Sequence, residues 1–421
     1  MNKGVMLRKY VHYILLDIYN STKTIDNSFD RFSINKLEKR DIDFINNVCL
    51  NSMRFFFHTE KIISFYVKKR PSLHQRLLLG SAITQIVYLN FKDYAVIDCS
   101  VEIAKKIKKQ HGFINAILNK IVINKNELRK TKIDYSVLPI WFKRETKNLS
   151  ESEKKNFIFE YCRKPNLHIV FKNQKYLSNF ENEIIQTSSK SGFLKNEEKV
   201  DNIPSFKSGQ WWIQDYSSFV PLNNIDDTLI NGSNFDICAA PGGKAFQILS
   251  RGKEITLNDI NKKRIHILKK NLKRLKFQAK IENYNFENIV ETKKYNFIII
   301  DAPCSAIGTI RKNPEIFFRN KEPNFKRLIE LQKNLLIKAS KLLEKNGLIL
   351  YMVCSFFKKE TIDQIDNFLN NNKEYDIYEF PKKNDSNYDK VVKKKLMLTL
   401  PAQINGRNVD GYFATYLKKN K

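Results

Sequence analysis

The feature that most constrains the fold of this 421-residue chain is a regular alternation of apolar runs and helical patterns after Asn231. The runs "NFDIC", "EITLN", "YNFIIID" and "GLILYMV" are separated by segments whose apolar residues recur at helical spacing. Strands that alternate with helices form βαβ units, in which the strands are parallel and helices cover both faces of the sheet. We therefore predict an α/β domain over residues 226–421, and its end, "KKLMLTLP…DGYFATYLKK", indicates a β-hairpin.

Residues 1–135 carry a different pattern, in which apolar residues recur at helical spacing and glycine and proline are nearly absent. This pattern predicts an all-α domain. His12, His58, His74 and His111 lie within or beside the helical segments, and we interpret them as structural rather than catalytic. The domain is either a helical scaffold or a module that docks RNA through lysines on its outer faces.

Residues 136–225 mix the two patterns. "LPIWFKRET" opens with a helix-breaking proline, "ESEKKNFIFEYC" is typical of a helix, and "PNLHIVFKN" and "GQWWIQD" are typical of short strands. We predict a small α+β connector. Trp211 and Trp212 could stack on bases, but such residues more often pack in an interdomain seam, and we favour the seam.

The formal net charge of +30 favours a polyanionic partner, most simply a nucleic acid. Lysine greatly outnumbers arginine, and asparagine, isoleucine and phenylalanine are plentiful, as an AT-rich genome would also produce. A drift of the amino-acid composition toward residues encoded by AT-rich codons explains part of the positive charge. Nucleic-acid binding remains the better explanation of the rest.

The six cysteines show neither a CxxC motif nor the spacing of Cys/His ligands. This argues against a zinc site and against a disulfide framework, and we expect no metal. The N-terminal segment is amphipathic rather than a signal peptide, and no apolar run reaches membrane-spanning length. We expect a cytoplasmic monomer without a membrane partner.

The first predicted strand of the α/β domain ends in a glycine loop, "DICAAPGGK", at residues 236–244. A P-loop would need an earlier glycine and a Ser or Thr after Lys244, where Ala245 stands, and the GxGxxG of a dinucleotide site is also absent. Glycines here let the backbone approach a ligand. The loop therefore suits the amino-acid part of a ligand such as S-adenosylmethionine.

The next two strand ends offer polar groups for the same ligand. Asp259 ends "TLND", where such folds place an acid that accepts hydrogen bonds from ribose hydroxyls. The third predicted strand ends in "KIENYN", which offers Asn283 or Asn285 to an adenine pocket.

The last two parallel strands end in Asp301 with Cys304, and in Cys354. Both cysteines could be buried structural residues, but each is followed by Ser and both fall at the edge where the ligand is expected. A thiol beside a sulfonium methyl donor suits carbon 5 of a pyrimidine, which becomes nucleophilic once a thiolate adds to carbon 6. The thiolate needs a lowered pKa, which helix N-termini and a basic group such as Lys244 can supply. Asp301 could hydrogen-bond the cytosine.

The segments "DICAAPGGKA", "NDINKKR", "IIIDAPCSAIGTIRKNPEI", "MVCSFFKKE" and "DGYFATYL" resemble, in order and spacing, the motifs of the Nol/Nop/Sun family of RNA cytosine-5 methyltransferases. The resemblance covers residues 231–421 and implies a Rossmann-like methyltransferase domain that uses S-adenosylmethionine. It assigns the nucleophile to Cys354 and product release to Cys304. It implies donor contacts from Cys238, Ala239, Ala240, Pro241, Gly242, Gly243, Lys244, Asp259, Asn285 and Asp301.

A weaker resemblance extends upstream. "YAVIDCSVEIAKKIKKQHGFINAILNKI" is similar to the closing helices of the NusB-like domain found in the bacterial Sun (Fmu) subgroup, which methylates a cytosine of 16S ribosomal RNA. This implies a NusB-like domain over residues 1–135, the connector over 136–225 and a methyltransferase domain over 226–421. The partner would be 16S ribosomal RNA, naked or in an early assembly intermediate.

Three positions depart from the family pattern. Ala245 replaces the usual Thr, Asn285 stands where an Asp usually contacts the donor, and Phe171 replaces an arginine of the connector. We expect weaker donor binding rather than inactivity, and one RNA contact is in doubt. Two alternatives stay open: a non-catalytic ribosome-assembly factor, and a transfer-RNA cytosine-5 methyltransferase.

Overall fold

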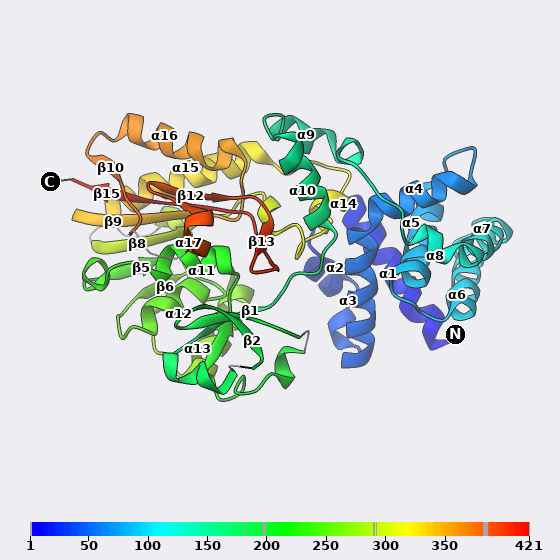
Figure 1. Ribbon diagram of the computed structural model, residues 1–421, viewed down its shortest axis with the longest axis horizontal. Coiled ribbons are helices and arrows are strands. Elements are labelled where there is room, and N and C mark those ends of the chain that lie inside the picture. The colour runs from blue at the N-terminus through cyan, green and yellow to red at the C-terminus, as the bar shows by residue number, and fades with distance from the viewer. Residues whose placement is uncertain are drawn as a thin grey trace. The chain divides into compact units, whose positions relative to one another are not determined.

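The computed structural model describes residues 2–180, 182–196, 199–288, 291, 293–381 and 386–420 (Figure 1). It contains two compact units. The N-terminal unit comprises Met1–Arg163 and Ile310–Pro323, and the C-terminal unit comprises Lys164–Thr309 and Asn324–Lys421. The segment predicted as a connector, 136–225, thus divides between the two units instead of forming a unit of its own.

The N-terminal unit is helical, as the periodicity predicts. Helix α1 buries one apolar stripe, whereas α5 is buried on all sides from Arg76 to Ile83, and a π-helical turn, η2 (Thr84–Tyr88), continues α5. The helices are α1 (Lys3–Tyr19), α2 (Ile25–Arg31), α3 (Lys39–Arg54), α4 (Phe56–Tyr66), α5 (Leu73–Ile83), α6 (Asp93–Lys106), α7 (His111–Ile123), α8 (Lys125–Leu128), α9 (Ile140–Glu145), α10 (Glu151–Tyr161) and α14 (Glu315–Phe318).

Three of the histidines predicted as structural belong to this helical packing. His12 is fully buried, and its Nε2 lies 3.1 Å from Nδ1 of His74. Burial lowers the pKa of both His12 and His58 to about 4, so both rings are neutral at physiological pH.

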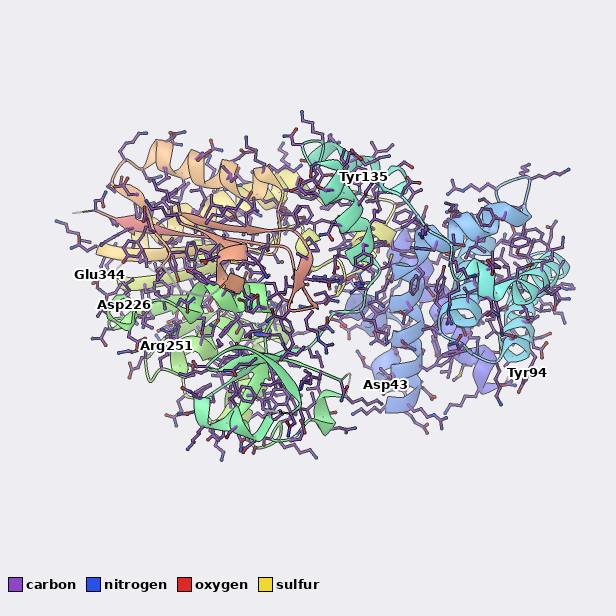
Figure 2. All side chains as sticks on the ribbon, viewed as in Figure 1. Asp43, Tyr94, Tyr135, Asp226, Arg251 and Glu344 are labelled. Atoms are coloured by element: carbon purple, nitrogen blue, oxygen red, sulfur yellow. The ribbon has the colours of Figure 1, made fainter. Side chains whose placement is uncertain are left out.

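The side chain of Tyr94 is exposed on the surface of α6 (Figure 2).

The segment 310–323 belongs to the N-terminal unit although it follows the "DAPCS" motif in sequence. Phe318 of this segment packs edge-on against Phe56, with ring centroids 5.0 Å apart. Arg311 is fully buried, and its Nη1 donates to Oε2 of Glu160 in α10 at 2.6 Å. The backbone oxygen of Arg311 accepts from Nη2 of Arg54 at 3.0 Å. A buried ion pair and aromatic contacts therefore hold this segment in the unit.

The C-terminal unit contains a mixed sheet in the order β11-β12-β15-β9-β8-β5-β6-β7, with β10 also paired to β15. The pairs from β9 through β7 are parallel and those of β15 are antiparallel. The α/β prediction is therefore confirmed, and β12 and β15 pair as the expected C-terminal antiparallel strands. The strands are β5 (Asn234–Asp236), β6 (Thr256–Asn258), β7 (Ile281–Glu282), β8 (Tyr295–Asp301), β9 (Leu343–Val353), β10 (Tyr375–Tyr378), β11 (Val392–Lys393), β12 (Leu396–Thr399) and β15 (Tyr412–Lys419), with a separate hairpin of β13 (Ala402–Ile404) and β14 (Arg407–Val409).

Alternate residues of the central strands face opposite helical layers (Figure 1). In β8, Ile299 packs with α12 (Gly243–Leu249) and α13 (Lys262–Leu275), whereas Ile298 and Ile300 pack with α15 (Phe325–Leu342) and α16 (Ile362–Asn371). Both faces of β8 are buried, which explains why its sequence is continuously apolar. Two further helices, α11 (Tyr216–Asn223) and α17 (Ser386–Val391), complete the unit.

A four-stranded antiparallel sheet, in the order β2-β3-β1-β4, precedes the large sheet in sequence. Its strands are β1 (His168–Phe171), β2 (Ile184–Ser188), β3 (Ser191–Leu194) and β4 (Trp211–Ile213). Trp211 and Trp212 are buried, and Trp212 packs edge-on against Phe246 of α12. Trp211 belongs to the core of the small sheet, and both tryptophans lie within the C-terminal unit. Their burial argues against the stacking of RNA bases on exposed rings, and the interdomain seam stays a prediction.

No helix among the described residues is long and apolar enough to cross a membrane. Over the same residues, no group of His, Cys, Asp and Glu has the arrangement of a metal site.

The buried pair in the N-terminal unit gives the first prediction. Arg311→Met removes the 2.6 Å ion pair of the buried Glu160 carboxylate, which also lies 3.9 Å from Nε of Arg163, so the free energy of unfolding of this unit should fall by ~3–5 kcal/mol in urea titrations followed by circular dichroism. The double variant Arg311→Met/Glu160→Met also removes the buried carboxylate, so it should recover part of the lost free energy of unfolding. Lys130→Ala, which removes an exposed ion pair with Glu127, is the control and should cause no measurable change. Equal stability of Arg311→Met and the unaltered protein would contradict this account.

Candidate active site

The predicted site residues lie at the carboxyl ends of the parallel strands. Asp301 ends β8 and pairs in register with Met352 of β9, two residues before Cys354. Asp236 ends β5, whose neighbours are β6 and β8. Because parallel strands present the same end to one edge of the sheet, the polar strand endings are brought together there.

The two cysteines that end β8 and β9 are in contact. Sγ of Cys304 lies 3.3 Å from Sγ of Cys354, and all six cysteines are free thiols. The backbone amide of Gly308 donates to the carbonyl oxygen of Cys354 at 3.0 Å, which ties one cysteine turn to the other. At position 308 an added Cβ would lie only 1.8 Å from the backbone oxygen of Gly411, so only glycine permits this approach.

The contact perturbs the acidity of Cys304. Its hydrogen bond with Cys354 is the largest cause that raises the pKa of Cys304 well above the ordinary value, and burial and the charges of Cys354 and Glu360 add to it. Cys304 is therefore a thiol that holds its proton more tightly than an ordinary cysteine. Nζ of Lys244 donates to Oδ2 of Asp301 at 2.6 Å, so its partner is a carboxylate, and its effect on a thiolate stays a prediction.

Asp301 lies at the centre of a polar triad. Lys244 bonds one carboxylate oxygen, and the hydroxyl of Tyr412 donates to the other at 2.8 Å. Burial, followed by the charge of Asp301, raises the pKa of Tyr412 well above its ordinary value, so this tyrosine is a neutral donor. Tyr412 was not predicted as a site residue. The signal that could have indicated it is its place at the start of the apolar run in "DGYFATYL".

The glycine loop leads from β5 into α12, and Lys244 lies in the first turn of that helix. Gly242 has φ of +117°, and a Cβ there would lie 2.1 Å from the ring of Phe246, so glycine is required on both counts. From α13, Arg264 donates to the carbonyl oxygen of Ala240, and Nδ2 of Asn271 donates to that of Pro241 at 3.2 Å. The predicted loop from Cys238 to Lys244 is thus fixed by α12 and α13.

Asp236 is fully buried beneath this loop. Its Oδ1 accepts from the amide of Cys238 at 3.3 Å, whereas Oδ2 has no hydrogen-bond partner. Burial raises the pKa of Asp236 to about 7, against the attraction of Lys244. A buried polar atom without a partner is costly unless a ligand or water satisfies it, so this position favours a polar ligand at the loop.

The predicted ribose acid, Asp259, also anchors the loop. It is buried, its Oδ2 accepts from the amide of Ala240 at 3.2 Å, and Arg264 lies 3.5 Å from the same oxygen. Asn283 is exposed and donates from Nδ2 to the backbone oxygen of Asp259 at 2.7 Å. Asn285 is partly buried and follows β7. The assignments of Asp259 and Asn285 to the donor stay predictions.

The other two departures from the family pattern are both buried in apolar surroundings. Ala245 belongs to the core between the large sheet and α12. Phe171 belongs to the core of the small sheet, and its ring centroid lies 5.2 Å from that of Phe180. A phenylalanine in this core has no group to offer RNA, which agrees with the doubt about one RNA contact.

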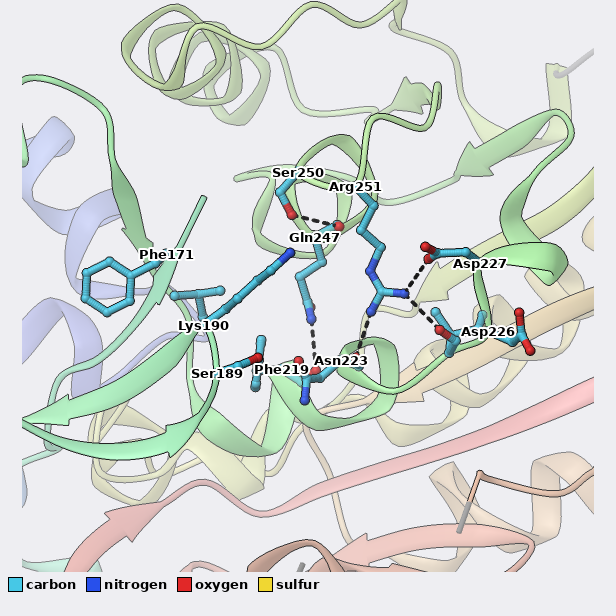
Figure 3. A pocket seen from close by; sticks show the side chains of 12 residues that line it. Phe171, Ser189, Lys190, Phe219, Asn223, Asp226, Asp227, Gln247, Ser250 and Arg251 are labelled. Carbon is cyan, nitrogen blue, oxygen red and sulfur yellow. Dashed lines mark hydrogen bonds and ion pairs between the residues drawn. The ribbon is translucent and has the colours of Figure 1, made fainter. Parts of the chain in front are cut away.

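A further cavity of about 460 Å³ lies beside α11 and α12 (Figure 3). Arg251 crosses one wall of it, donating to Asp227 at 2.9 Å and to the backbone oxygens of Leu222, Asn223 and Ile225. Its terminal nitrogens are thus used in fixing the chain after α11. Because Arg251 follows α12 and precedes β6, this cavity lies toward the amino ends of the strands, away from the cysteines.

Comparison with solved structures supports the fold. The crystal structure of PH0851 aligns over 100% of this chain and 99% of its own, with a TM-score of 0.72 and 20% identity. The structure of NSun6 from Pyrococcus horikoshii with SFG aligns over 67% of this chain and 98% of its own, with a TM-score of 0.54 and 16% identity.

Curated relatives share most of the chain. The ribosomal RNA small subunit methyltransferase B of Vibrio vulnificus is 25% identical over 362 residues, which are 79% of this chain and 84% of the relative. The protein of the same name from Photorhabdus laumondii is 28% identical over 322 residues, or 72% and 74% of the two chains.

Two family models match different parts of the chain. Residues 7–122 match the NusB family, and residues 226–418 match the family described as 16S rRNA methyltransferase RsmB/F. Together they span most of the sequence, and the second includes both cysteine turns and the glycine loop. Residues 226–418 therefore carry a domain of the family described as 16S rRNA methyltransferase RsmB/F, and residues 7–122, ahead of it, carry a domain of the NusB family.

Proposed function

We propose that this protein transfers a methyl group from S-adenosylmethionine to carbon 5 of a cytosine in 16S ribosomal RNA. The observation that carries the proposal is the pair of thiols, Cys304 and Cys354, whose sulfur atoms lie 3.3 Å apart beside Asp301. Transfer to a nitrogen or oxygen atom needs a positioned base at most. A pair of thiols at the ligand edge is instead suited to covalent activation of a pyrimidine ring.

The residues at the glycine loop fit the donor. The unpartnered Oδ2 of Asp236, the glycine that lets the backbone approach at position 242, and the carboxylate of Asp259 together suit its amino, carboxylate and hydroxyl groups. When bound, the donor supplies a methyl group on a positively charged sulfur. Cys238–Lys244, Asp259, Asn285 and Asp301 are the residues that would hold it.

Cys354 would act as the nucleophile. Its thiolate adds to carbon 6 of the cytosine, and the electron pair of the ring double bond moves to carbon 5, which then takes the methyl group. Loss of the proton from carbon 5 returns an electron pair to the ring. The bond between Sγ of Cys354 and carbon 6 then breaks, which releases the methylated base and restores the thiolate.

Cys304 would act in the second half of this cycle. In the free protein the hydrogen bond with Cys354, followed by burial and then by the charge of Cys354, raises the pKa of Cys304. Once Sγ of Cys354 is bonded to carbon 6, that charge is gone and the pKa of Cys304 falls. Cys304 would pass its proton to solvent and, as a thiolate, take the proton from carbon 5; its sulfur lies 3.3 Å from that of Cys354, which bonds to the adjoining carbon 6.

Asp301 would recognise the base. Lys244 and Tyr412 use one lone pair on each carboxylate oxygen and fix its orientation. A carboxylate has about four acceptor sites, so sites remain for the cytosine amino group and the ring nitrogen when that nitrogen carries a proton. Stabilising the protonated ring would draw electrons from carbon 6 and favour attack by Cys354.

The exposed face of α13 would contact the RNA backbone. The helix, "KKRIHILKKNLKRL", contains no acidic residue, and Lys269, Lys270 and Lys273 are exposed without an ion-pair partner among the described residues. The same helix holds the donor loop through Arg264 and Asn271. A row of lysines beside the site suits phosphate groups of a substrate strand.

The nucleophile assignment gives a prediction. Cys354→Ala should lower methyl transfer to 16S ribosomal RNA by ~10⁴-fold or more, because the sulfur that forms the bond to carbon 6 is removed. Transfer is measured with donor labelled in the methyl group. Calorimetry serves as the control: the variant should still bind S-adenosylmethionine. Turnover retained by Cys354→Ala would refute the assignment, and a protein of unaltered sequence that binds no donor would favour the non-catalytic assembly factor.

The release assignment gives a separate prediction. Cys304→Ala should accumulate a covalent adduct of RNA with Cys354, visible as a retarded band on denaturing gels, because the carbon-5 proton is no longer removed. The double variant Cys304→Ala/Cys354→Ala should give no such band. Rapid turnover by Cys304→Ala without an adduct would mean that another group removes the proton.

The α13 surface gives a prediction about salt. Replacing Lys269, Lys270 and Lys273 by Gln should weaken RNA binding and make the slope of log K against log salt shallower, by ~0.7 for each phosphate of single-stranded RNA that the protein no longer neutralises. The matched control replaces Lys293, Lys345 and Lys373, which are also exposed but lie near the amino ends of β8, β9 and β10, the opposite edge of the sheet. Equal slopes for the two triple variants would exclude α13 as the phosphate-binding surface.

A further inference from the structure

A buried glutamate lies behind the two cysteine turns. Glu360 ends the short 3₁₀ helix η10 (Lys358–Glu360), which follows β9, and its side chain has no solvent exposure. The surrounding sequence, "FFKKE", gives no sign of burial. Burying a carboxylate is costly unless hydrogen bonds compensate for lost water, so the partners of Glu360 indicate what it does.

Those partners are the residues that follow the two cysteines. Oε1 of Glu360 accepts from the backbone amide of Ser305 at 2.8 Å, and Oε2 accepts from the hydroxyl of Ser305 at 2.5 Å. Oε2 also accepts from the hydroxyl of Ser355 at 2.6 Å. Ser305 follows Cys304 and Ser355 follows Cys354, so one carboxylate joins both turns.

Groups around the carboxylate hold it in place. Nε2 of Gln332 in α15 lies 3.3 Å from Oε1 of Glu360 and donates to the backbone oxygen of Pro303 at 3.0 Å. The hydroxyl of Tyr351 in β9 donates to the backbone oxygen of Glu360 at 3.0 Å. The donors are neutral, and hydrogen bonds from several neutral donors to one ionised acceptor are stronger and more directional than bonds between neutral groups.

The chemistry makes a strict demand on the two turns. One thiol must bond to carbon 6 while the other reaches the proton on carbon 5 of the same ring, and a misplacement of about 1 Å can cost ~10²-fold in rate. Cys304 and Cys354 lie on different strands, 50 residues apart in sequence. Contact between the two sulfur atoms does not by itself fix their orientation.

We propose that Glu360 is a positioning residue that locks the Cys304 and Cys354 turns together, so that both thiols act on one base. The proposal rests on the proposed function for its catalytic meaning. Its geometric part does not, because the distance between the thiols can be measured without RNA or donor. Glu360 would contact neither the RNA nor the donor, and it acts on the two cysteine turns through Ser305 and Ser355.

The first test measures proximity in the full chain without substrate. Diamide oxidises two thiols to a disulfide and takes up both protons and both electrons itself. The rate at which the Cys304–Cys354 disulfide forms, followed by peptide mass spectrometry, is divided by the rate at which iodoacetamide alkylates Cys354. This division corrects for altered thiol reactivity, because loss of the Glu360 charge also changes the acidity of Cys304.

Glu360→Gln should lower this ratio by about tenfold or more, since the amide keeps the size of the side chain but cannot accept charge-assisted hydrogen bonds at both oxygens. Asp363→Asn is the matched control: it removes an exposed carboxylate three residues away that pairs with Lys358, and its ratio should equal that of the unaltered protein. Thermal unfolding verifies that the variants are folded. A ratio for Glu360→Gln within about twofold of the unaltered protein would overturn the proposal.

Two further variants keep the test decisive if Glu360→Gln does not fold. Ser305→Ala and Ser355→Ala each remove one hydroxyl and leave the carboxylate, and each should lower the ratio, with the double variant lower than either. Unchanged ratios in both would overturn the proposal in the same way.

The second test reads the catalytic consequence. In steady-state methylation, Glu360→Gln should lower kcat by about tenfold or more and leave KM for RNA within about twofold, because the residue acts on alignment and not on binding. A rise in KM with unchanged kcat would contradict a positioning role. If the unaltered protein shows no methyl transfer, the proposed function fails, whereas the disulfide ratio still decides whether Glu360 locks the two turns.

Discussion

The parallel pairing of β8 with β9 is the constraint on which the site depends. Its register sets Asp301 opposite Met352, so the turns after both strands emerge side by side and bring the sulfur atoms of Cys304 and Cys354 to 3.3 Å. Both strands are buried on two faces, and a slip by one residue would turn the apolar set of β9 toward the wrong helical layer. The register that the core requires is therefore also the register that assembles the thiol pair.

Four fixed polar groups give this pair its environment. Asp301 is held by Lys244 and Tyr412 on one side, and the carboxylate of Glu360 lies behind the turns on the other. The two cysteines are also in contact, and the hydrogen bond with Cys354, followed by burial, raises the pKa of Cys304. In the proposed cycle the same contact therefore sets the order of events, with Cys354 acting first and Cys304 becoming a base only in the adduct.

The α/β fold and the edge that carries Asp301, Cys304 and Cys354 could be predicted, because apolar runs mark buried strands and parallel strands end at one edge. Glu360 could not, because it stands in a lysine-rich stretch and its burial depends on Ser305, 55 residues earlier. Arg311 looks like a surface residue in "IRKNPEI", yet it is buried against Glu160 in the N-terminal unit. Lys244 was expected to serve a thiolate, and only the packing of α12 against Asp301 shows its partner. The local hydrophobic pattern of a sequence predicts its helices and strands. It does not predict which side chains distant in sequence become partners, because that depends on tertiary packing.

The central claim is that this protein methylates carbon 5 of a cytosine in 16S ribosomal RNA. Bisulfite sequencing tests it most directly, because 5-methylcytosine resists the deamination that converts cytosine to uracil. Ribosomal RNA from cells with and without the protein should differ at one cytosine of the 16S molecule, which stays unconverted only when the protein is present. An identical conversion pattern across the whole 16S sequence in both samples would contradict the claim.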